Sequence, residues 1–168
     1  MKWHSGRVEV YREFKTVFTA RAVYLSGDIL ESVVEFESRS KLLSPDERRE
    51  LEERLVGDKG TFKVLLGFYT PGDELNDLAG EESIWVTYLE DPDGTVTRGT
   101  CLGVDEDEYS VYMRFLKWDL SWSKLYILCF PMDPAVREPA DGQINLVISG
   151  SQGRGEIRLK TSPPGSVP

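Results

Sequence analysis

The sequence predicts an all-β (mainly β) protein, an antiparallel two-sheet β-sandwich of the immunoglobulin-like type with one short surface helix. Apolar residues recur at every second position through much of the chain, as in Phe62, Val64, Leu66 and Phe68. This spacing places side chains on one face of a strand. Turn signals also separate the strands at intervals of roughly 8–12 residues, which is typical of sandwiches. A closed barrel is the alternative arrangement of the same strands.

The length of 168 residues corresponds to one domain. A domain of about 150 residues buries roughly 70% of its unfolded surface, so the core alone can stabilise it. We divide the chain into an N-terminal arm over residues 1–6, a sandwich domain over residues 7–160 and a flexible tail over residues 161–168. The tail contains three prolines, which argues against further regular structure there.

The first strand region is predicted over residues 7–25. It is long for a single strand, so we expect a bulge or bend near residues 12–15. The segment Ser26–Asp28 has the composition of a turn. Residues 29–37 are then expected to return as a second strand, paired with the first as a hairpin.

The single helix is predicted over residues 44–56. Ser44 suits the N-cap, Pro45 suits the first helical position, and Glu47 completes a capping box. Gly57 ends the helix. Its apolar stripe is narrow, so we expect the helix to lie on the sandwich as a lid or crossover.

The rest of the domain is expected to consist of strands joined by turns. The segment Asp91–Gly94 predicts a tight hairpin turn, and Gly150–Gly153 predicts the turn of the last hairpin. The expected strands cover residues 61–70, 83–90, 95–104, 109–118, 124–131, 142–149 and 154–160.

The charge of the chain excludes some classes of partner. The net charge is −9, and such a field repels nucleic acid and anionic lipid. We therefore expect no nucleic-acid binding. No apolar run approaches the ~20 residues of a membrane helix, so no transmembrane segment is expected.

The first residues bear on the cellular location. Residues 1–6 contain no apolar segment of the kind found in signal peptides. We expect a cytoplasmic protein if Met1 is the natural start. If Met1 was added to a mature domain, we expect a periplasmic or cell-envelope protein.

Catalytic motifs are absent from the sequence. The single histidine, His4, lies in the N-terminal arm and leaves no Ser–His or Cys–His pair in the domain. The glycine-rich segment Gly150–Gly155 joins two strands, whereas a phosphate-binding loop precedes a helix. Glu31 and Glu35 share one face of a predicted strand and could form an acid pair, although a solvated edge strand explains them equally well. We expect no enzymatic activity.

Three tryptophans are candidates for a ligand-binding surface. Trp85, Trp118 and Trp122 come from segments close in sequence, and exposed aromatic platforms bind sugars or partner chains. Core filling or cover by the helix is the structural alternative.

Acidic loops are candidates for calcium binding. Asp73 and Asp77 fall in one loop, Asp105 and Asp107 in another, and both loops are expected at the same end of the sandwich. Carboxylates are suitable calcium ligands, but the loops lack the Asp-x-Asp-x-Asp-Gly spacing. We therefore expect no cofactor, with Ca²⁺ as the alternative.

The two cysteines, Cys101 and Cys129, lie in predicted strands among apolar neighbours. Two reduced, buried thiols are the simpler interpretation. The alternative is a disulfide between strands, which would require an oxidising compartment.

The sequence as a whole favours a non-catalytic β-sandwich module that mediates protein–protein interaction, with an envelope or surface component as one form of that role. The partner protein and the oligomeric state stay open. A carbohydrate- or calcium-binding sandwich is the alternative, and an acid-pair hydrolase is the second alternative.

Overall fold

The computed structural model describes residues 5–57, 60–116, 118, 122–131 and 142–161. Nine strands, three α-helices and one short 3-10 helix lie within this part of the chain. The predicted arm and tail, together with His4, fall almost wholly outside the described residues. None of the described helices has the length and apolar content that crossing a membrane requires.

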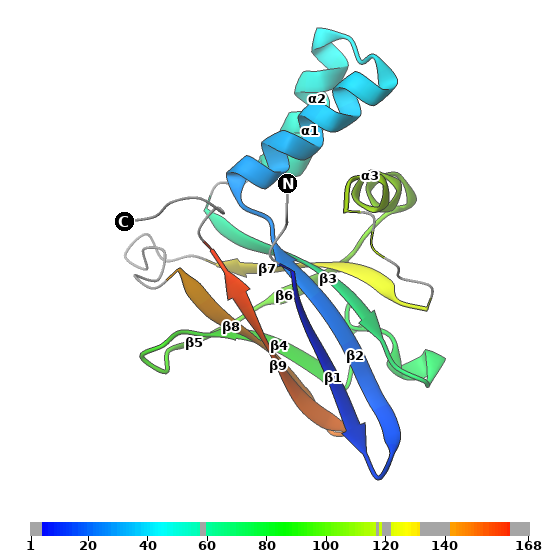
Figure 1. The fold of residues 1–168 in the computed structure, drawn as a ribbon, viewed down its shortest axis with the longest axis vertical. Coiled ribbons are helices and arrows are strands. Elements are labelled where there is room, and N and C mark those ends of the chain that lie inside the picture. Colours follow the sequence, from blue (N-terminus) through cyan, green and yellow to red (C-terminus); the bar gives the residue numbers. More distant parts are fainter. Residues whose placement is uncertain (1–4, 58–59, 117, 119–121, 132–141, 162–168) are drawn as a thin grey trace.

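The strands form two antiparallel sheets (Figure 1). Sheet A has the order β1 (Gly6–Arg12), β2 (Lys15–Tyr24), β3 (Thr61–Tyr69), β7 (Lys124–Pro131) and β6 (Thr100–Gly103). Sheet B has the order β5 (Val96–Arg98), β4 (Trp85–Glu90), β8 (Gln143–Gly150) and β9 (Gly153–Lys160). The predicted mainly β, two-sheet antiparallel sandwich is confirmed, whereas its immunoglobulin-like character is not.

Helices form a further layer on sheet A. The hairpin of α1 (Gly27–Lys41) and α2 (Pro45–Val56) connects β2 to β3 and projects beyond the sheets (Figure 1). Helix α3 (Glu106–Leu116) connects β6 to β7, and the 3-10 helix η1 (Asp73–Leu75) follows β3. The predicted helix over residues 44–56 is confirmed as α2, including its capping box. The prediction of one surface helix is wrong, because α1 and α3 replace two expected strands.

Helix α1 occupies the segment predicted as a strand over residues 29–37. Ser26 caps this helix, since its Oγ accepts a hydrogen bond from the Ile29 amide at 3.4 Å. The buried residues Leu30, Val33, Val34 and Glu37 have helical spacing. The misleading signal is the interval of four between Ile29 and Val33, because this interval satisfies both the strand and the helix period.

Helix α3 occupies most of the segment predicted as a strand over residues 109–118. The Oδ1 atom of Asp105 accepts a hydrogen bond from the Glu108 amide at 2.8 Å and so caps the helix. Glu106, Asp107 and Glu108 form the first turn, where acidic residues favour the helix dipole. The acidic run expected to be a loop tip is therefore a helix start.

The long predicted strand region over residues 7–25 is a hairpin. Glu13 and Phe14 form a two-residue turn between β1 and β2, within the segment where we expected a bend. The register shifts between Val10 and Tyr11, which marks a β-bulge near the turn.

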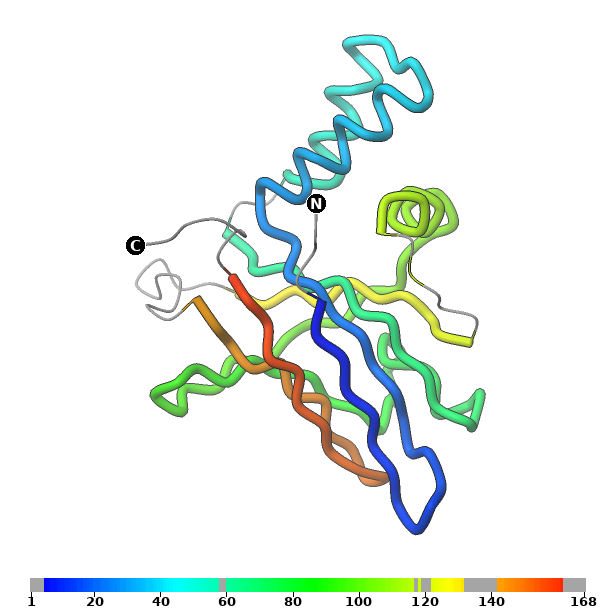
Figure 2. The backbone as a smooth tube through the Cα atoms, in the orientation of Figure 1, coloured from blue at the N-terminus to red at the C-terminus, as the bar shows by residue number. Residues whose placement is uncertain are grey.

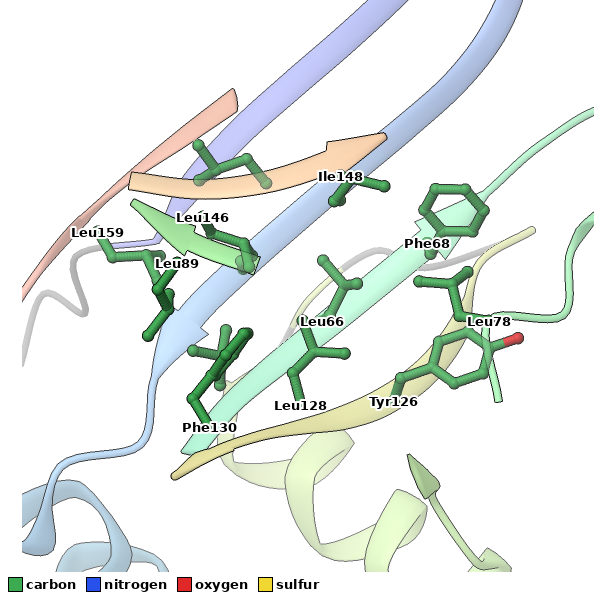
Figure 3. Packing of buried hydrophobic residues seen from close by; sticks show 14 of the residues in the cluster. Leu66, Phe68, Leu78, Leu89, Tyr126, Leu128, Phe130, Leu146, Ile148 and Leu159 are labelled. Atoms are coloured by element: carbon green, nitrogen blue, oxygen red, sulfur yellow. The ribbon is translucent and has the colours of Figure 1, made fainter. Parts of the chain in front are cut away.

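The inter-sheet core consists of apolar side chains from both sheets and the loop after β3 (Figure 3). Phe68, Leu66 and Leu128 are fully buried there. Glycines allow close approach: a Cβ at Gly155 of β9 would lie 2.8 Å from the ring of Phe18. Both sheets therefore bury their facing sides against each other.

A second core lies between the outer face of sheet A and the helices. Val33 and Leu55 from the helical hairpin and Val111 from α3 pack with Leu65 of β3 and Val23 of β2. The centre of sheet A, at β3, is consequently buried on both faces, which explains the apolar residues on both sides of this strand.

Candidate interaction surface

Trp85 lies inside the inter-sheet core. Its side chain is 5% exposed, and its ring centroid lies 5.2 Å from that of Phe18 and 5.4 Å from that of Phe68. Its Nε1 donates a hydrogen bond to the Leu75 carbonyl at 2.8 Å. The structure therefore uses Trp85 for core filling.

The other two tryptophans lie in different surroundings. Trp118 is buried in the second core, with the Arg21 guanidinium carbon 4.9 Å from its ring centroid. Trp122 is 81% exposed. The three tryptophans do not form a common platform, and Trp122 alone retains the exposure that ligand binding requires.

The four aspartates considered as calcium ligands each lie in a turn, at the N-cap of a helix or in the first turn of a helix. Asp77 Oδ1 accepts a hydrogen bond from the Gly80 amide at 2.9 Å, and Asp105 caps α3. Asp73 begins η1 and Asp107 lies in the first turn of α3. Within the described ranges, no three His, Cys, Asp or Glu side chains are grouped to hold a metal ion.

The two cysteines lie on adjacent strands but are not joined by a disulfide. Cys129 pairs with Thr100 and Cys101 pairs with Leu128, so the two side chains point to opposite faces of the sheet. Burial is the main cause that raises the pKa of the Cys101 thiol to about 12, and the negative charge of Asp77 contributes less. Cys101 is therefore protonated at neutral pH and is a poor nucleophile.

The acid pair considered for a hydrolase lies on α1 and not on a strand. Glu35 forms ion pairs with Arg39 at 2.6 Å and with Arg48 at 2.9 Å. Glu35 therefore forms surface ion pairs within α1 and between α1 and α2.

The turn between β1 and β2 carries an exposed aromatic residue that the sequence analysis missed. Phe14 is fully exposed, at 106% of the reference area, and Tyr11 is 58% exposed. Both turn residues have left-handed backbones, with φ of 51° at Glu13 and 65° at Phe14. We call residues 11–15 the hairpin tip. The tip extends past the other strand ends of the sheets (Figure 2).

The charges of the hairpin tip differ from those of the rest of the chain. Arg12 and Lys15 are both exposed and face each other directly in the β1–β2 register. Like charges in this arrangement destabilise a strand pair. With Glu13 between them, the two cations give the hairpin tip a net charge of +1, on a protein of net charge −9.

A groove of about 390 Å³ lies among α1, α2 and α3. Leu43, Leu51 and Val111 contribute its apolar lining. Its acidic lining comes from Glu37, Glu47, Glu50 and Asp107, and its basic lining comes from Lys41 and Arg54. We call this site the helical groove.

Glu37 in the helical groove is buried and fully paired. It is 1% exposed, and both of its oxygens accept hydrogen bonds from Arg114, at 3.1 Å from Nε and 2.7 Å from Nη2. Lys41 Nζ lies 3.3 Å from Oε2. This cluster ties α1 to α3 and fixes one wall of the groove.

Comparison with known proteins adds information about the fold alone. No protein-family model and no curated protein matches the chain. A solved structure of similar fold is a novel protein of unknown function from Burkholderia pseudomallei K96243. It shares 15% sequence identity with this chain, covers 92% of this chain and 78% of its own length, and has a TM-score of 0.50.

Proposed function

We propose that the protein is a non-catalytic β-sandwich module that binds another protein through its hairpin tip. The observation that carries this proposal is Phe14, a bulky apolar side chain that is fully exposed and has a left-handed backbone. Strained residues at an exposed position are typical of binding sites.

The backbone conformation of the hairpin tip lowers the free energy of unfolding of the protein. A left-handed backbone costs roughly 1–2 kcal/mol for each residue that is not glycine. Asn-Gly is the usual sequence of a two-residue turn of this type, but Glu13 and Phe14 occupy these positions. A role in binding, and not in folding, accounts for an aromatic residue at this position.

The net charge of the chain favours a protein partner over a lipid surface. An aromatic residue in a partner's pocket can contribute about 2 kcal/mol or more. One phenylalanine in a bilayer contributes a similar amount, about 1.5–3 kcal/mol. However, the net charge of −9 repels anionic lipids, and one side chain alone gives weak membrane binding.

Site-specific photocrosslinking tests the proposal. A benzophenone side chain at position 14 is expected to trap a protein partner, whereas the same group at Leu102, which is 51% exposed on β6, is not. For the trapped partner, Phe14→Gly should weaken affinity at least about tenfold, because the apolar side chain is removed. Leu102→Ala is the control and should leave affinity unchanged. Equal affinities for the Phe14→Gly variant and the unmodified protein would overturn the proposal.

Carbohydrate binding is the second candidate, and the exposure of Trp122 favours it. A sugar that stacks on this ring would stabilise the native state, because ligand binding raises stability by mass action. Thermal unfolding with millimolar oligosaccharides should then show a rise in Tm that Trp122→Ala abolishes. An unchanged Tm across the sugars excludes this function.

A further inference from the structure

We propose that the partner of the hairpin tip is a second copy of this chain, and that the tip of one copy occupies the helical groove of the next. This inference rests on the proposed function, because it names the partner for the same surface. It follows from the charges, the apolar surfaces and the positions of the two sites.

The charges of the two sites are complementary. Arg12 and Lys15 flank Phe14 at the hairpin tip. The helical groove presents the exposed carboxylates of Glu47, Glu50 and Asp107. With Glu13 counted, the tip has a net charge of +1, and the ionisable residues that line the groove, four acidic and two basic, have a net charge of −2. The two sites therefore have opposite net charges, and such complementarity influences which surfaces associate.

The apolar surfaces of the two sites also correspond. Leu43, Leu51 and Val111 line the groove and can contact the Phe14 ring. The volume of about 390 Å³ falls within the range of small-ligand pockets, about 300–1,000 Å³. The groove is thus large enough for one benzyl side chain.

The two cations of the groove are compatible with an aromatic guest. Arg54 lines the groove from the exposed side of α2, and a guanidinium group can stack on an aromatic face. Lys41 is already paired with Glu37. Phe14 could therefore occupy the groove without burying an unpaired positive charge, because Lys41 stays paired and Arg54 stacks on the ring.

The positions of the two sites determine the type of assembly. The hairpin tip and the α1–α2 hairpin lie at opposite ends of the long axis of the molecule (Figure 1). Two different surfaces that meet in this way form a head-to-tail contact, which gives rings or open chains of copies. A hairpin tip is also small, so we expect weak association that increases with protein concentration.

Sedimentation velocity from low micromolar to near-millimolar concentration tests the inference. The unmodified protein should form species larger than a dimer as concentration rises. Phe14→Gly and Glu50→Arg/Asp107→Arg should each weaken self-association at least about tenfold. An unmodified protein that stays monomeric over this range would overturn the inference.

Mixing these two variants is the decisive experiment. The Phe14→Gly variant retains an intact groove, and the Glu50→Arg/Asp107→Arg variant retains an intact tip. An equimolar mixture of the two should therefore give a one-to-one dimer that does not grow. A mixture that stays monomeric contradicts the head-to-tail contact. Circular dichroism and thermal unfolding should confirm that both variants are folded, as expected for exposed positions.

Charge reversal on both sides gives an independent test. Arg12→Glu/Lys15→Glu should weaken self-association. Mixing this variant with Glu50→Arg/Asp107→Arg should restore growth beyond a one-to-one dimer, because the reversed tip of the first variant can then bind the reversed groove of the second. A mixture that stops at the dimer would show that these charges do not determine the contact. Leu102→Ala is the matched control and should associate normally. If the protein is monomeric but position 14 still crosslinks to a different protein, this inference fails while the proposed function stands.

Discussion

The inter-sheet core and the core beneath the helices differ in how they are stabilised. The inter-sheet core receives apolar side chains from nearly every strand. The helical layer depends on fewer contacts, since α2 buries only Leu51 and Leu55. It also contains Glu37, the one charged side chain that is buried among the described residues. From this comparison we expect substitutions in the helical layer to destabilise the protein less than substitutions in the inter-sheet core.

The largest effect is expected in the inter-sheet core. Phe68→Ala removes a fully buried ring and should lower the free energy of unfolding by about 3–5 kcal/mol. Urea unfolding measures this change, and both layers should lose structure together. Selective loss of the helices in this variant would contradict the comparison.

A smaller effect is expected at the buried ion pair. Glu37→Ala removes the acceptor of Arg114 and should lower the free energy of unfolding by about 2 kcal/mol, since hydrogen bonds to charged groups contribute about 1.5–3 kcal/mol. Arg114 is half exposed and can be hydrated again, which limits the loss. Hydrogen exchange should accelerate in α1 and α3 more than in β8.

The matched control for this experiment is Glu35→Ala. Glu35 forms exposed ion pairs on the same helix, and such pairs contribute about 0–1 kcal/mol. Equal destabilisation by the two substitutions would show that the burial of Glu37 has no special role.

A stabilising effect is expected at the turn of the sheet layer. Glu13→Asn with Phe14→Gly should raise the free energy of unfolding by about 1–2 kcal/mol, because both positions have left-handed backbones. Thermal unfolding measures the gain. A loss of stability would mean that Phe14 contributes to the fold, which would remove the main support for a binding role.

The smallest effect is expected at the equivalent position in the helical layer. Leu42 ends α1 with φ of 54° and is 87% exposed. Leu42→Gly should therefore raise the free energy of unfolding by about 1 kcal/mol. Chemical denaturation checks the value, and no change would show that relief of strain is offset by the greater freedom of glycine in the unfolded chain.

The sequence was sufficient to predict the sandwich and α2, but not α1 or α3. Strand periodicity is unambiguous where many apolar residues alternate, as in β3, and Ser44 with Glu47 gives a clear capping signal. In α1 the interval of four residues fits both periods. The caps Ser26 and Asp105 were visible in the sequence and could have indicated the two missed helices.

The candidate site was less predictable than the fold. Tryptophan content indicated Trp85 and Trp118, but the packing of several distant segments buries both. Phe14 was missed because Glu13 and Phe14 lack the glycine or asparagine that normally indicates a tight turn. Only the three-dimensional register reveals that Arg12 and Lys15 face each other beside it.

Strand β2 connects the two sites proposed to associate, since it begins at the hairpin tip and leads into α1. Its 10 residues, at about 3.3 Å each, extend over about 33 Å. In the proposed assembly, the length of β2 would contribute to the spacing between successive copies. Lengthening β1 and β2 by two residues each would preserve which side chains face the core. It would increase the repeat of the proposed assembly by about 7 Å, a change that electron microscopy of an assembly could resolve.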